Sequence, residues 1–109
     1  MNSGSPIDFS SIDTAVHGPI RLGVLTALQT EDVLDFTTLK SRLGVADGAI
    51  GTHLQKLEAI GYVACAKQFV GRRPRSTYRL TDEGRAALFN YLEMMQKLID
   101  SLTNNHTDL

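Results

Sequence analysis

The sequence predicts a mainly α-helical α+β domain with one small antiparallel β-hairpin and a long C-terminal helix. Three observations lead to this fold class. Apolar residues recur at helical spacing over much of the chain, two segments rich in β-branched and aromatic residues flank the break GRRPR, and an amphipathic stretch of about twenty residues follows. With 109 residues, 42% of them apolar and 21% charged, the chain has the size and composition of one soluble globular domain.

Two helices are expected before the first extended segment. One is predicted over about Phe9 to Val16 and the other over Pro19 to Gln29, because apolar residues recur at helical spacing in both. Proline suits the first helical turn, where the N–H that it lacks would have no partner within the helix. A short extended piece is expected around Leu34 to Phe36.

A short helix and a longer helix then form a predicted helix-turn-helix. Thr37 or Thr38 can cap the short helix, which is expected to end at Gly44. Asp47 can cap the longer helix, which Gly61 is expected to terminate. Two helices joined by so short a turn are typical of this motif.

Two strands joined by a basic loop follow the helix pair. The strands are predicted at residues 62–70 and 76–80, and GRRPR breaks the pattern between them. Thr81, with two acidic residues behind it, can cap a last helix that is expected to end near Ser101. The predicted organisation is a flexible N-terminus over residues 1–6, one domain over 7–102 and a flexible tail over 103–109.

The composition favours a cytoplasmic protein that has no membrane span and no cofactor. Cys65 is the single cysteine and cannot form an internal disulfide, no secretion signal opens the chain, and no apolar run is long enough to cross a bilayer. We expect Cys65 to be a small buried residue, with oxidation sensing as the alternative. Three scattered histidines and no glycine-rich phosphate loop leave nothing arranged for catalysis, so neither an enzyme nor a bound metal is expected.

The distribution of charge indicates a nucleic-acid partner, although the formal net charge is only −1. Five of the eleven basic residues fall within residues 67–79, which contain no acidic residue: Lys67, Arg72, Arg73, Arg75 and Arg79. A local basic patch, more than the overall charge, attracts phosphate. A basic loop can also serve solubility alone, but this one follows a helix-turn-helix and would lie beside the groove that the second helix occupies.

The second helix of the pair has one apolar face and one small, polar face. Ile50, Leu54 and Leu57 make the predicted buried stripe. Short or hydrogen-bonding side chains allow a helix to enter the DNA major groove, which is about 12 Å wide, although solvated helix faces show the same pattern. The opposite face is nearly free of acid and consists of Gly48, Thr52, Gln55, Lys56 and Ala59.

Gly51 and His53 in this helix each have two interpretations. A glycine inside a helix costs about 0.5 to 1 kcal/mol relative to alanine. Gly51 is therefore explained either by close approach of DNA or by close packing against the short helix, and we favour packing. His53 lies near the edge of the apolar stripe, and we favour a half-buried structural histidine over a base-reading one while keeping it as a candidate.

This part of the chain resembles the winged-helix domain of MarR-like transcriptional regulators. The resemblance is carried by DGAIGTHLQKLEAIGYV and KQFVGRRPRSTYRLTDEGRAAL, and it covers about Asp13 to Leu98. HGPIR, from His17 to Arg21, is similar to the His-x-Pro-x-Arg opening of a short stand-alone group in that class. The resemblance implies a winged helix-turn-helix in which Asp47 to Ile60 form the recognition helix, Val70 to Arg75 form the wing, and the first and last helices build a dimer.

The expected function is sequence-specific binding of double-stranded DNA by a homodimeric transcriptional regulator. The recognition helix is expected in the major groove and the wing on the minor groove or on phosphates. Relatives commonly have serine where Ala46 stands, and asparagine or serine among the positions of Ala49 and Gly51, so this chain has fewer base-reading groups. The candidate DNA-contacting residues are Thr38, Asp47, Gly48, Ala49, Gly51, Thr52, His53, Gln55, Lys56, Arg72, Arg73, Arg75 and Thr77.

The last helix carries an apolar seam that predicts dimerisation. Its members recur at spacings of four, three, four and three residues, as in a coiled coil. A two-fold pair would place two recognition helices about 34 Å apart, which matches successive major grooves. The alternative is a helix that packs only on its own core. The candidate interface residues are Leu88, Tyr91, Leu92, Met95, Leu98, Ile99 and Leu102.

Two other functions stay open from the sequence. The same fold can serve as a protein-docking module without DNA binding, and the overall acidity favours that interpretation. A small-molecule effector, whose identity the sequence does not give, can also lodge between the dimerisation helices and the DNA-binding core. Phe89, Tyr91, Met94 and Met95 would line such a pocket, but we favour a dimer interface for them.

Overall fold

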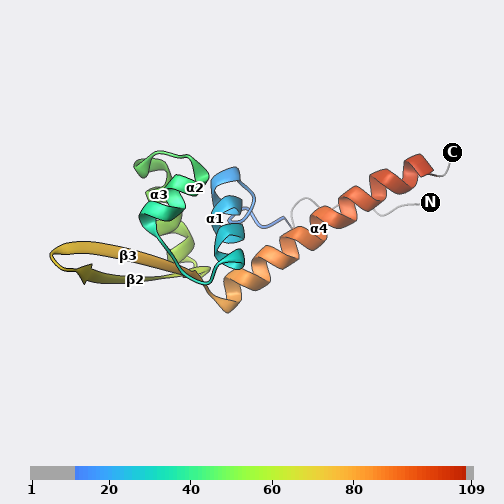
Figure 1. The fold of residues 1–109 in the computed structure, drawn as a ribbon. Coiled ribbons are helices and arrows are strands. Elements are labelled where there is room, and N and C mark those ends of the chain that lie inside the picture. Colours follow the sequence, from blue (N-terminus) through green and yellow to red (C-terminus); the bar gives the residue numbers. More distant parts are fainter. Residues whose placement is uncertain (1–11, 108–109) are drawn as a thin grey trace.

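The computed structural model describes residues 12–107, which form four helices and one three-stranded antiparallel sheet (Figure 1). This confirms the predicted class, a winged helix-turn-helix with a long C-terminal helix. The elements in chain order are α1 (Pro19–Thr30), β1 (Leu34–Asp35), α2 (Phe36–Leu43), α3 (Asp47–Ala59), β2 (Val63–Val70), β3 (Arg73–Leu80) and α4 (Asp82–Thr107).

The segment before α1 is a turn, so the helix predicted over Phe9 to Val16 is wrong in its described part; residues 9–11 lie outside the described residues. The Asp13 carboxylate accepts a hydrogen bond from the Ala15 N–H at 2.9 Å, and the Asp13 carbonyl accepts from the N–H groups of Val16 and His17. An aspartate that bonds the following backbone in this way favours a turn over a continuing helix. Regular helix begins only at Pro19, the first residue of α1.

The helix-turn-helix is present, but a different residue caps α2. Asp35 precedes the helix, and its carboxylate accepts a hydrogen bond from the Thr38 N–H at 2.7 Å. The predicted caps, Thr37 and Thr38, are inside the helix, because the short strand β1 ends one residue earlier than expected. Gly44 closes α2 as predicted, with a φ of 64° in the left-handed region.

The longer helix α3 begins without a side-chain cap. Ala46 occupies the cap position and offers no side-chain acceptor, and Asp47 is the first helical residue. The Asp47 carboxylate instead lies 2.7 Å from the Lys40 ammonium and so ties the two helices of the motif together. Gly61 follows the end of α3 with a φ of 86°, as the sequence predicted.

The sheet has the order β1-β3-β2, and its two long strands form a hairpin. The register pairs Val63 with Leu80 at the base of the hairpin and Val70 with Arg73 at its tip. Only Gly71 and Arg72 lie between the strands, so the connection is shorter than the predicted basic loop. Gly71 has a φ of 64°, which suits the first central residue of a tight hairpin turn.

The hydrophobic core lies between the helices and the base of the sheet. At the base, Val63 and Leu80 are buried, whereas every residue from Ala66 to Arg75 is exposed. The tip of the hairpin therefore projects beyond the helices into solvent. The buried core consists of Val16, Val24, Leu25, Leu28, Leu34, Leu39, Ile50, Leu54, Leu57, Val63, Leu80, Ala87, Leu88 and Tyr91. Within the described part of the chain, no helix has the length and apolarity needed to cross a membrane.

Helix α4 begins at the predicted cap and extends further than predicted. The Thr81 hydroxyl accepts a hydrogen bond from the Gly84 N–H at 2.9 Å, and the helix runs to Thr107 rather than ending near Ser101. A Cβ on Gly84 would collide with the Tyr62 carbonyl, so glycine is required where α4 crosses the start of the hairpin. The first half of α4 packs on the core, and the second half projects from the body (Figure 1).

Candidate nucleic-acid interface

Helix α3 divides into a buried face and an exposed face, as the sequence predicted. Ile50, Leu54 and Leu57 have at most 1% of their surface exposed. The opposite face is open to solvent, and no acidic residue lies within it. Its exposed members are Gly48, Ala49, Thr52, Gln55, Lys56 and Ala59, with Asp47 at the N-terminal end and Glu58 at the flank.

Two glycines leave this exposed face without side chains. A Cβ added to Gly48 or to Gly51 would meet no atom within 4 Å. The favoured interpretation of Gly51, close packing against the short helix, is therefore wrong, because nothing in the described structure occupies that space. The hydroxyl of Thr52, the residue after Gly51, donates to the Gly48 carbonyl at 3.0 Å and so stays close to the helix surface. The result is a helix face on which another surface can approach the backbone closely.

His53 is half-buried, and the structure supports the structural interpretation of this residue. Its Nδ1 lies 3.1 Å from Nη1 of Arg21, which belongs to α1. Burial lowers the pKa of His53, and the nearby cations Arg21 and Lys56 lower it further. The neutral imidazole is thus the favoured form at neutral pH, which leaves the contact with the guanidinium intact.

The predicted wing is the tip of a regular hairpin, and its strands extend into the segment predicted as a loop. Arg73 and Arg75 belong to β3, and only Arg72 lies in the two-residue turn. Successive strand residues point to opposite faces of the sheet, so Arg73, Arg75 and Arg79 share the face opposite to buried Leu80. The basic residues are therefore held in a fixed register along the hairpin.

The three arginines of the tip differ in their partners. Nη2 of Arg75 lies 3.2 Å from the Asp35 carboxylate at the N-terminus of α2, so this arginine anchors the hairpin to the helix-turn-helix. Hydrogen bonds from Thr38, helped by Arg75, hold the pKa of the Asp35 carboxyl below its usual value. Across residues 12–107, neither Arg72 nor Arg73 has an ion-pair partner, and both are exposed.

Two of the candidate DNA-contacting residues, Thr38 and Thr77, lie on neither α3 nor the hairpin tip, and both have structural contacts. The Thr38 N–H donates to the Asp35 carboxylate, which caps α2, and the Thr77 hydroxyl donates to the Ala66 carbonyl at 3.4 Å across the hairpin. Thr77 is also the register partner of Asp35. Both threonines are half-buried, and their predicted contact with DNA stays a prediction.

Sequence reasoning missed an apolar pair of residues at the tip. Phe69 is 73% exposed and Val70 is 57% exposed, although their side chains suit a core. Phe69 faces Pro74 across the hairpin, and Val70 faces Arg73. The sequence feature that indicates their exposure is Gly71, which allows a two-residue turn. With so tight a turn, both strands continue outward, and residues 66–70 lie away from the core.

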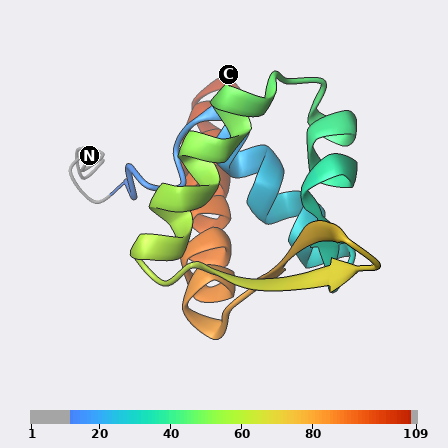
Figure 2. The ribbon, with the colours of Figure 1, turned by 90° about the vertical axis from the view of Figure 1, so that its left-hand side faces the viewer.

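Helix α3 and the hairpin lie on the same side of the molecule. In Figure 2 both are seen on the side that faces the viewer, and α4 passes behind them; in Figure 1 the hairpin tip and the free end of α4 lie at opposite ends. Helix α3 and the hairpin that carries Arg72 and Arg73 therefore lie on one side of the molecule. The structure does not bring either of them near the projecting half of α4.

The predicted dimer seam on α4 divides into buried and exposed residues. Leu88 and Tyr91 are only 2% and 8% exposed, so they belong to the chain's own core and have little surface left for a partner. Leu88 and Tyr91 have the same helical spacing as the apolar residues that follow them. The sequence alone therefore did not show where along α4 the core ends. Met95 and Leu98 are half-buried, whereas Leu92, Ile99 and Leu102 are exposed, together with Phe89.

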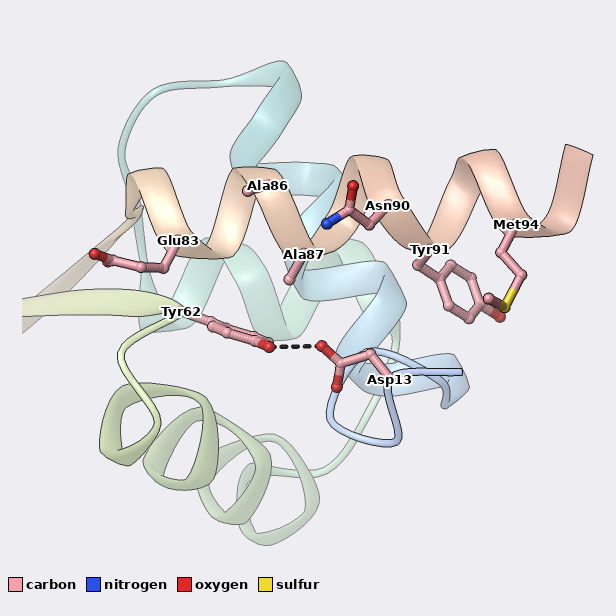
Figure 3. A pocket seen from close by; sticks show the side chains of 8 residues that line it. All are labelled: Asp13, Tyr62, Glu83, Ala86, Ala87, Asn90, Tyr91 and Met94. Atoms are coloured by element: carbon pink, nitrogen blue, oxygen red, sulfur yellow. Dashed lines mark hydrogen bonds between the residues drawn. The ribbon is translucent and has the colours of Figure 1, made fainter. Parts of the chain in front are cut away.

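A pocket of about 440 Å³ opens between the first half of α4 and the turn before α1 (Figure 3). The Tyr62 hydroxyl donates to the Asp13 carboxylate at 2.5 Å across it, and this bond, with burial and the charge of Asp13, raises the pKa of Tyr62 to about 12. Tyr91 and Met94 line the pocket as expected for an effector site, but Phe89 and Met95 do not. Among the described residues, no group of three or more His, Cys, Asp or Glu side chains is placed to hold a metal ion.

Comparison with known proteins gives a family and several similar folds. Residues 20–99 match the winged helix DNA-binding domain family. The chain is 33% identical over 78 residues to the uncharacterized protein MJ0432 from Methanocaldococcus jannaschii, which is 71% of this chain and 85% of that protein. The matched residues include α3, the hairpin and most of α4.

Two solved structures have the same arrangement of elements. The transcriptional regulator homologue protein from Pyrococcus horikoshii OT3 has a TM-score of 0.74 and 27% identity, over 81% of this chain and 87% of that one. A MarR-family transcriptional regulator from Silicibacter pomeroyi has a TM-score of 0.64 and 24% identity, over 81% of this chain and 58% of the regulator. The MarR-like fold expected from the sequence is therefore confirmed.

Proposed function

Because this chain belongs to the winged helix DNA-binding domain family, we propose that it is a transcriptional regulator that binds duplex DNA sequence-specifically as a homodimer. One observation carries the proposal. Helix α3, whose exposed face is poor in acid, lies on the same side of the molecule as the hairpin tip, where Arg72 and Arg73 have no ion-pair partner among residues 12–107 (Figure 2). A duplex laid on that side can meet both at once.

Helix α3 is the element that we place in the major groove. Thr52, Gln55 and Lys56 are exposed on its free face and carry the hydrogen-bonding groups that read base edges or bind phosphates. The empty space over Gly48 and Gly51 lets the helix backbone approach the groove more closely than side chains would allow. Asp47 at the helix start does not oppose this approach strongly, since Lys40 lies 2.7 Å from its carboxylate.

The hairpin tip is the element that we place on the minor groove or on phosphates. Arg72 in the turn and Arg73 beside it supply guanidinium groups that bind phosphate bidentately or enter a narrow minor groove. Arg75 has a different role, because its ion pair with Asp35 holds the hairpin against α2. We therefore assign DNA contact first to Arg72 and Arg73 and hairpin orientation to Arg75.

The projecting half of α4 is the surface that we propose for dimerisation. Ile99 and Leu102 are 54% and 58% exposed, Leu92 just before this half is 43% exposed, and among the described residues no part of the core covers them. An isolated helix of this length is marginally stable in water, and exposed apolar surface of this kind marks an interface. Pairing two such helices would cover both apolar seams and place two copies of α3 on one face of the DNA.

A ligand-responsive regulator is a second candidate, and the pocket beside Asp13, Tyr62 and Tyr91 favours it. A small molecule bound there would touch both α4 and the turn that leads into α1, and so could change the position of α3 relative to the dimer (Figure 3). Isothermal titration with candidate ligands, followed by DNA binding in their presence, tests this function. Absence of heat together with unchanged DNA affinity would remove it.

The proposed function is tested by the salt dependence of duplex binding. Duplexes that the purified protein selects from fragmented genomic DNA are titrated at several salt concentrations, with the wild type, Arg72→Ala and Arg73→Ala. We expect the logarithm of the affinity to fall steeply with the logarithm of the salt concentration, and each substitution to reduce the slope by about one.

The matched control is Arg85→Ala, which removes the same charge at the start of α4, where the guanidinium contacts Gln29 and Asp82. Its slope should equal that of the wild type. Duplex binding that ignores both salt and the two tip arginines, or no duplex binding by the wild type at all, would overturn the proposed function and favour a protein-docking module.

A further inference from the structure

The HGPIR segment, His17 to Arg21, joins α1 to both α3 and α4. Nδ1 of His17 lies 2.9 Å from the hydroxyl of Tyr91 in α4, and the centroids of the two rings are 5.8 Å apart. At the other end of the segment, Nη1 of Arg21 lies 3.1 Å from Nδ1 of His53 in α3. Five consecutive residues thus contact the helix proposed for DNA recognition and the helix proposed for dimerisation.

The guanidinium of Arg21 is held in place from several sides. Nη2 donates to the Thr14 carbonyl at 3.2 Å and to the His17 carbonyl at 3.0 Å, both of them outside α1. A Cβ on Gly18 would lie 2.7 Å from the same Nη2, so the guanidinium lies directly over a residue that has no side chain. Pro19 fixes the first turn of α1 immediately beside this site. The glycine and the proline of the motif therefore serve the position of the arginine.

A third contact ties the same region to the end of α3. The Tyr62 hydroxyl, just after α3, donates to the Asp13 carboxylate at 2.5 Å (Figure 3). Asp13 in turn holds the N–H groups of Ala15 and His17. Helix α3 is therefore braced by this turn at its middle, through Arg21 and His53, and at its end, through Tyr62.

We propose that residues 13–21 form a bracket that fixes the orientation of α3 relative to α4, with Arg21 as the positioning residue. The inference rests on the proposed function, since in a dimer built on α4 the bracket sets the separation and tilt of the two recognition helices. Arg21 acts through His53 and does not itself contact DNA. The bracket thereby determines which half-site spacing the dimer accepts.

The contact between Arg21 and His53 imposes one protonation state on the histidine. Arginine offers only donors, so Nδ1 of His53 must be an unprotonated acceptor and the ring proton must be on Nε2. The charged groups that face His53 are Arg21 of α1 and Lys56 of α3, and both are cations. Protonation of His53 removes the acceptor and adds a third positive charge, so acid opens the bracket.

The sign of the pH effect distinguishes this bracket from ordinary phosphate binding. Burial and the two cations lower the pKa of His53 in the folded chain below 6.5, so the unfolded chain takes up the proton first and folding is favoured less as the pH falls below that value. Histidines that only meet phosphate would strengthen DNA binding in acid. Opening of the bracket instead weakens specific binding as the pH falls.

The test compares three variants on a duplex selected by the wild type. Arg21→Met keeps much of the side-chain volume but has no donor; His53→Gln keeps an acceptor but does not titrate; Arg85→Met is the control for the loss of an arginine elsewhere. We expect Arg21→Met to lose about tenfold in affinity for the selected duplex and to select a different half-site spacing, with an unchanged salt slope. For each protein the affinity at pH 5.5 is expressed relative to its own affinity at pH 7.5, and His53→Gln should lose less affinity over this range than the wild type.

A second measurement needs no DNA and keeps the inference separate from the proposed function. Nitrogen NMR of the side chain should show His53 at pH 7.5 with an unprotonated Nδ1 in the wild type, and with mixed tautomers in Arg21→Met. A proton on Nδ1 in the wild type, or identical pH profiles for the wild type and His53→Gln, would overturn the bracket. A wild type that shows the expected tautomer but binds no duplex would instead contradict the proposed function and leave the bracket standing.

Discussion

The two ends of the molecule expose different kinds of surface. At one end, the free face of α3 presents small and polar residues, and the hairpin tip presents Arg72 and Arg73, free of ion pairs among the described residues, beside the exposed Phe69 and Val70. At the other end, the second half of α4 presents Ile99 and Leu102, each more than half exposed. The formal net charge of −1 is a sum over the whole chain and does not reveal the character of either surface. The difference indicates that the first surface suits a polyanion and the second suits another apolar surface.

The largest expected effect comes from charging the apolar end. Ile99→Glu combined with Leu102→Glu would place two carboxylates in the proposed dimer seam, where each would be desolvated without a partner. We expect a monomer by sedimentation equilibrium and a loss of about 100-fold or more in affinity for a two-half-site duplex, because the second half-site no longer adds to binding.

Ser101→Glu adds a carboxylate to the same exposed stretch of α4 and serves as the control. It should leave both the molecular mass and the DNA affinity close to those of the wild type. A double variant that remains a dimer, or a wild type that is already a monomer at the same concentration, would show that the apolar end has another use.

Two glycines give the next comparison, at the level of stability. Gly84→Ala would force a Cβ against the Tyr62 carbonyl and should lower the free energy of unfolding by about 1 to 3 kcal/mol. Gly51→Ala meets open space in a helix and should raise it by about 0.5 to 1 kcal/mol. Urea denaturation of the two variants and the wild type measures both, and equal effects of the two substitutions would contradict the packing described here.

The same Gly51→Ala variant sharpens the comparison at the DNA-facing end. If the space over Gly51 is filled by DNA, the added methyl group should lower duplex affinity by about tenfold while the fold becomes more stable. If Gly51→Ala makes the fold more stable and duplex binding weaker, the glycine serves DNA binding and not folding. Affinity that is unchanged or improved would show that the bare helix face is not a contact surface.

The smallest expected effect concerns Asp35, which joins the hairpin to α2. Hydrogen bonds from Thr38, followed by Arg75, lower the pKa of Asp35 in the folded chain below 3.8. Its stabilising contribution is therefore complete above about pH 4 and is lost as the pH falls through the lowered pKa. Asp35→Asn keeps a capping side chain but loses the ion pair, so it should cost less than about 1 kcal/mol at pH 7.

Thermal unfolding between pH 7 and pH 2 measures this difference. The wild type should lose its advantage over Asp35→Asn as the pH falls below about 4, and the two curves should converge in acid. A difference between them that stays constant with pH would show that the carboxylate charge at Asp35 contributes nothing.

The sequence predicted those parts of the fold that local pattern determines. Helical spacing located α1, α3 and α4, capping residues located α2, and glycine located the ends of α2 and α3. The failures came from side chains that bond the backbone near them. Asp13 closes a turn where apolar spacing predicted a helix, and Asp35 takes the capping role expected of the threonines that follow it.

Features of the candidate site that lie within one helix or strand could be predicted from the sequence. Features that depend on contacts between two elements could not. The buried and exposed faces of α3 followed from periodicity alone. The pairing of Arg75 with Asp35, the contact of Arg21 with His53 and the burial of Leu88 in the core each join residues far apart in sequence. No local pattern contains such contacts, so the division of roles among the arginines, and the end of the core along α4, became visible only in three dimensions.

The central claim is that DNA covers α3 and the hairpin tip and leaves the projecting half of α4 to the partner chain. Amide NMR of the wild type, with and without a selected duplex, tests it directly. The largest shift changes should fall on Gly48, Gly51 and Gly71, while amides from Leu92 to Leu102 change little. Large changes along α4, with α3 and the tip unaffected, would contradict the claim.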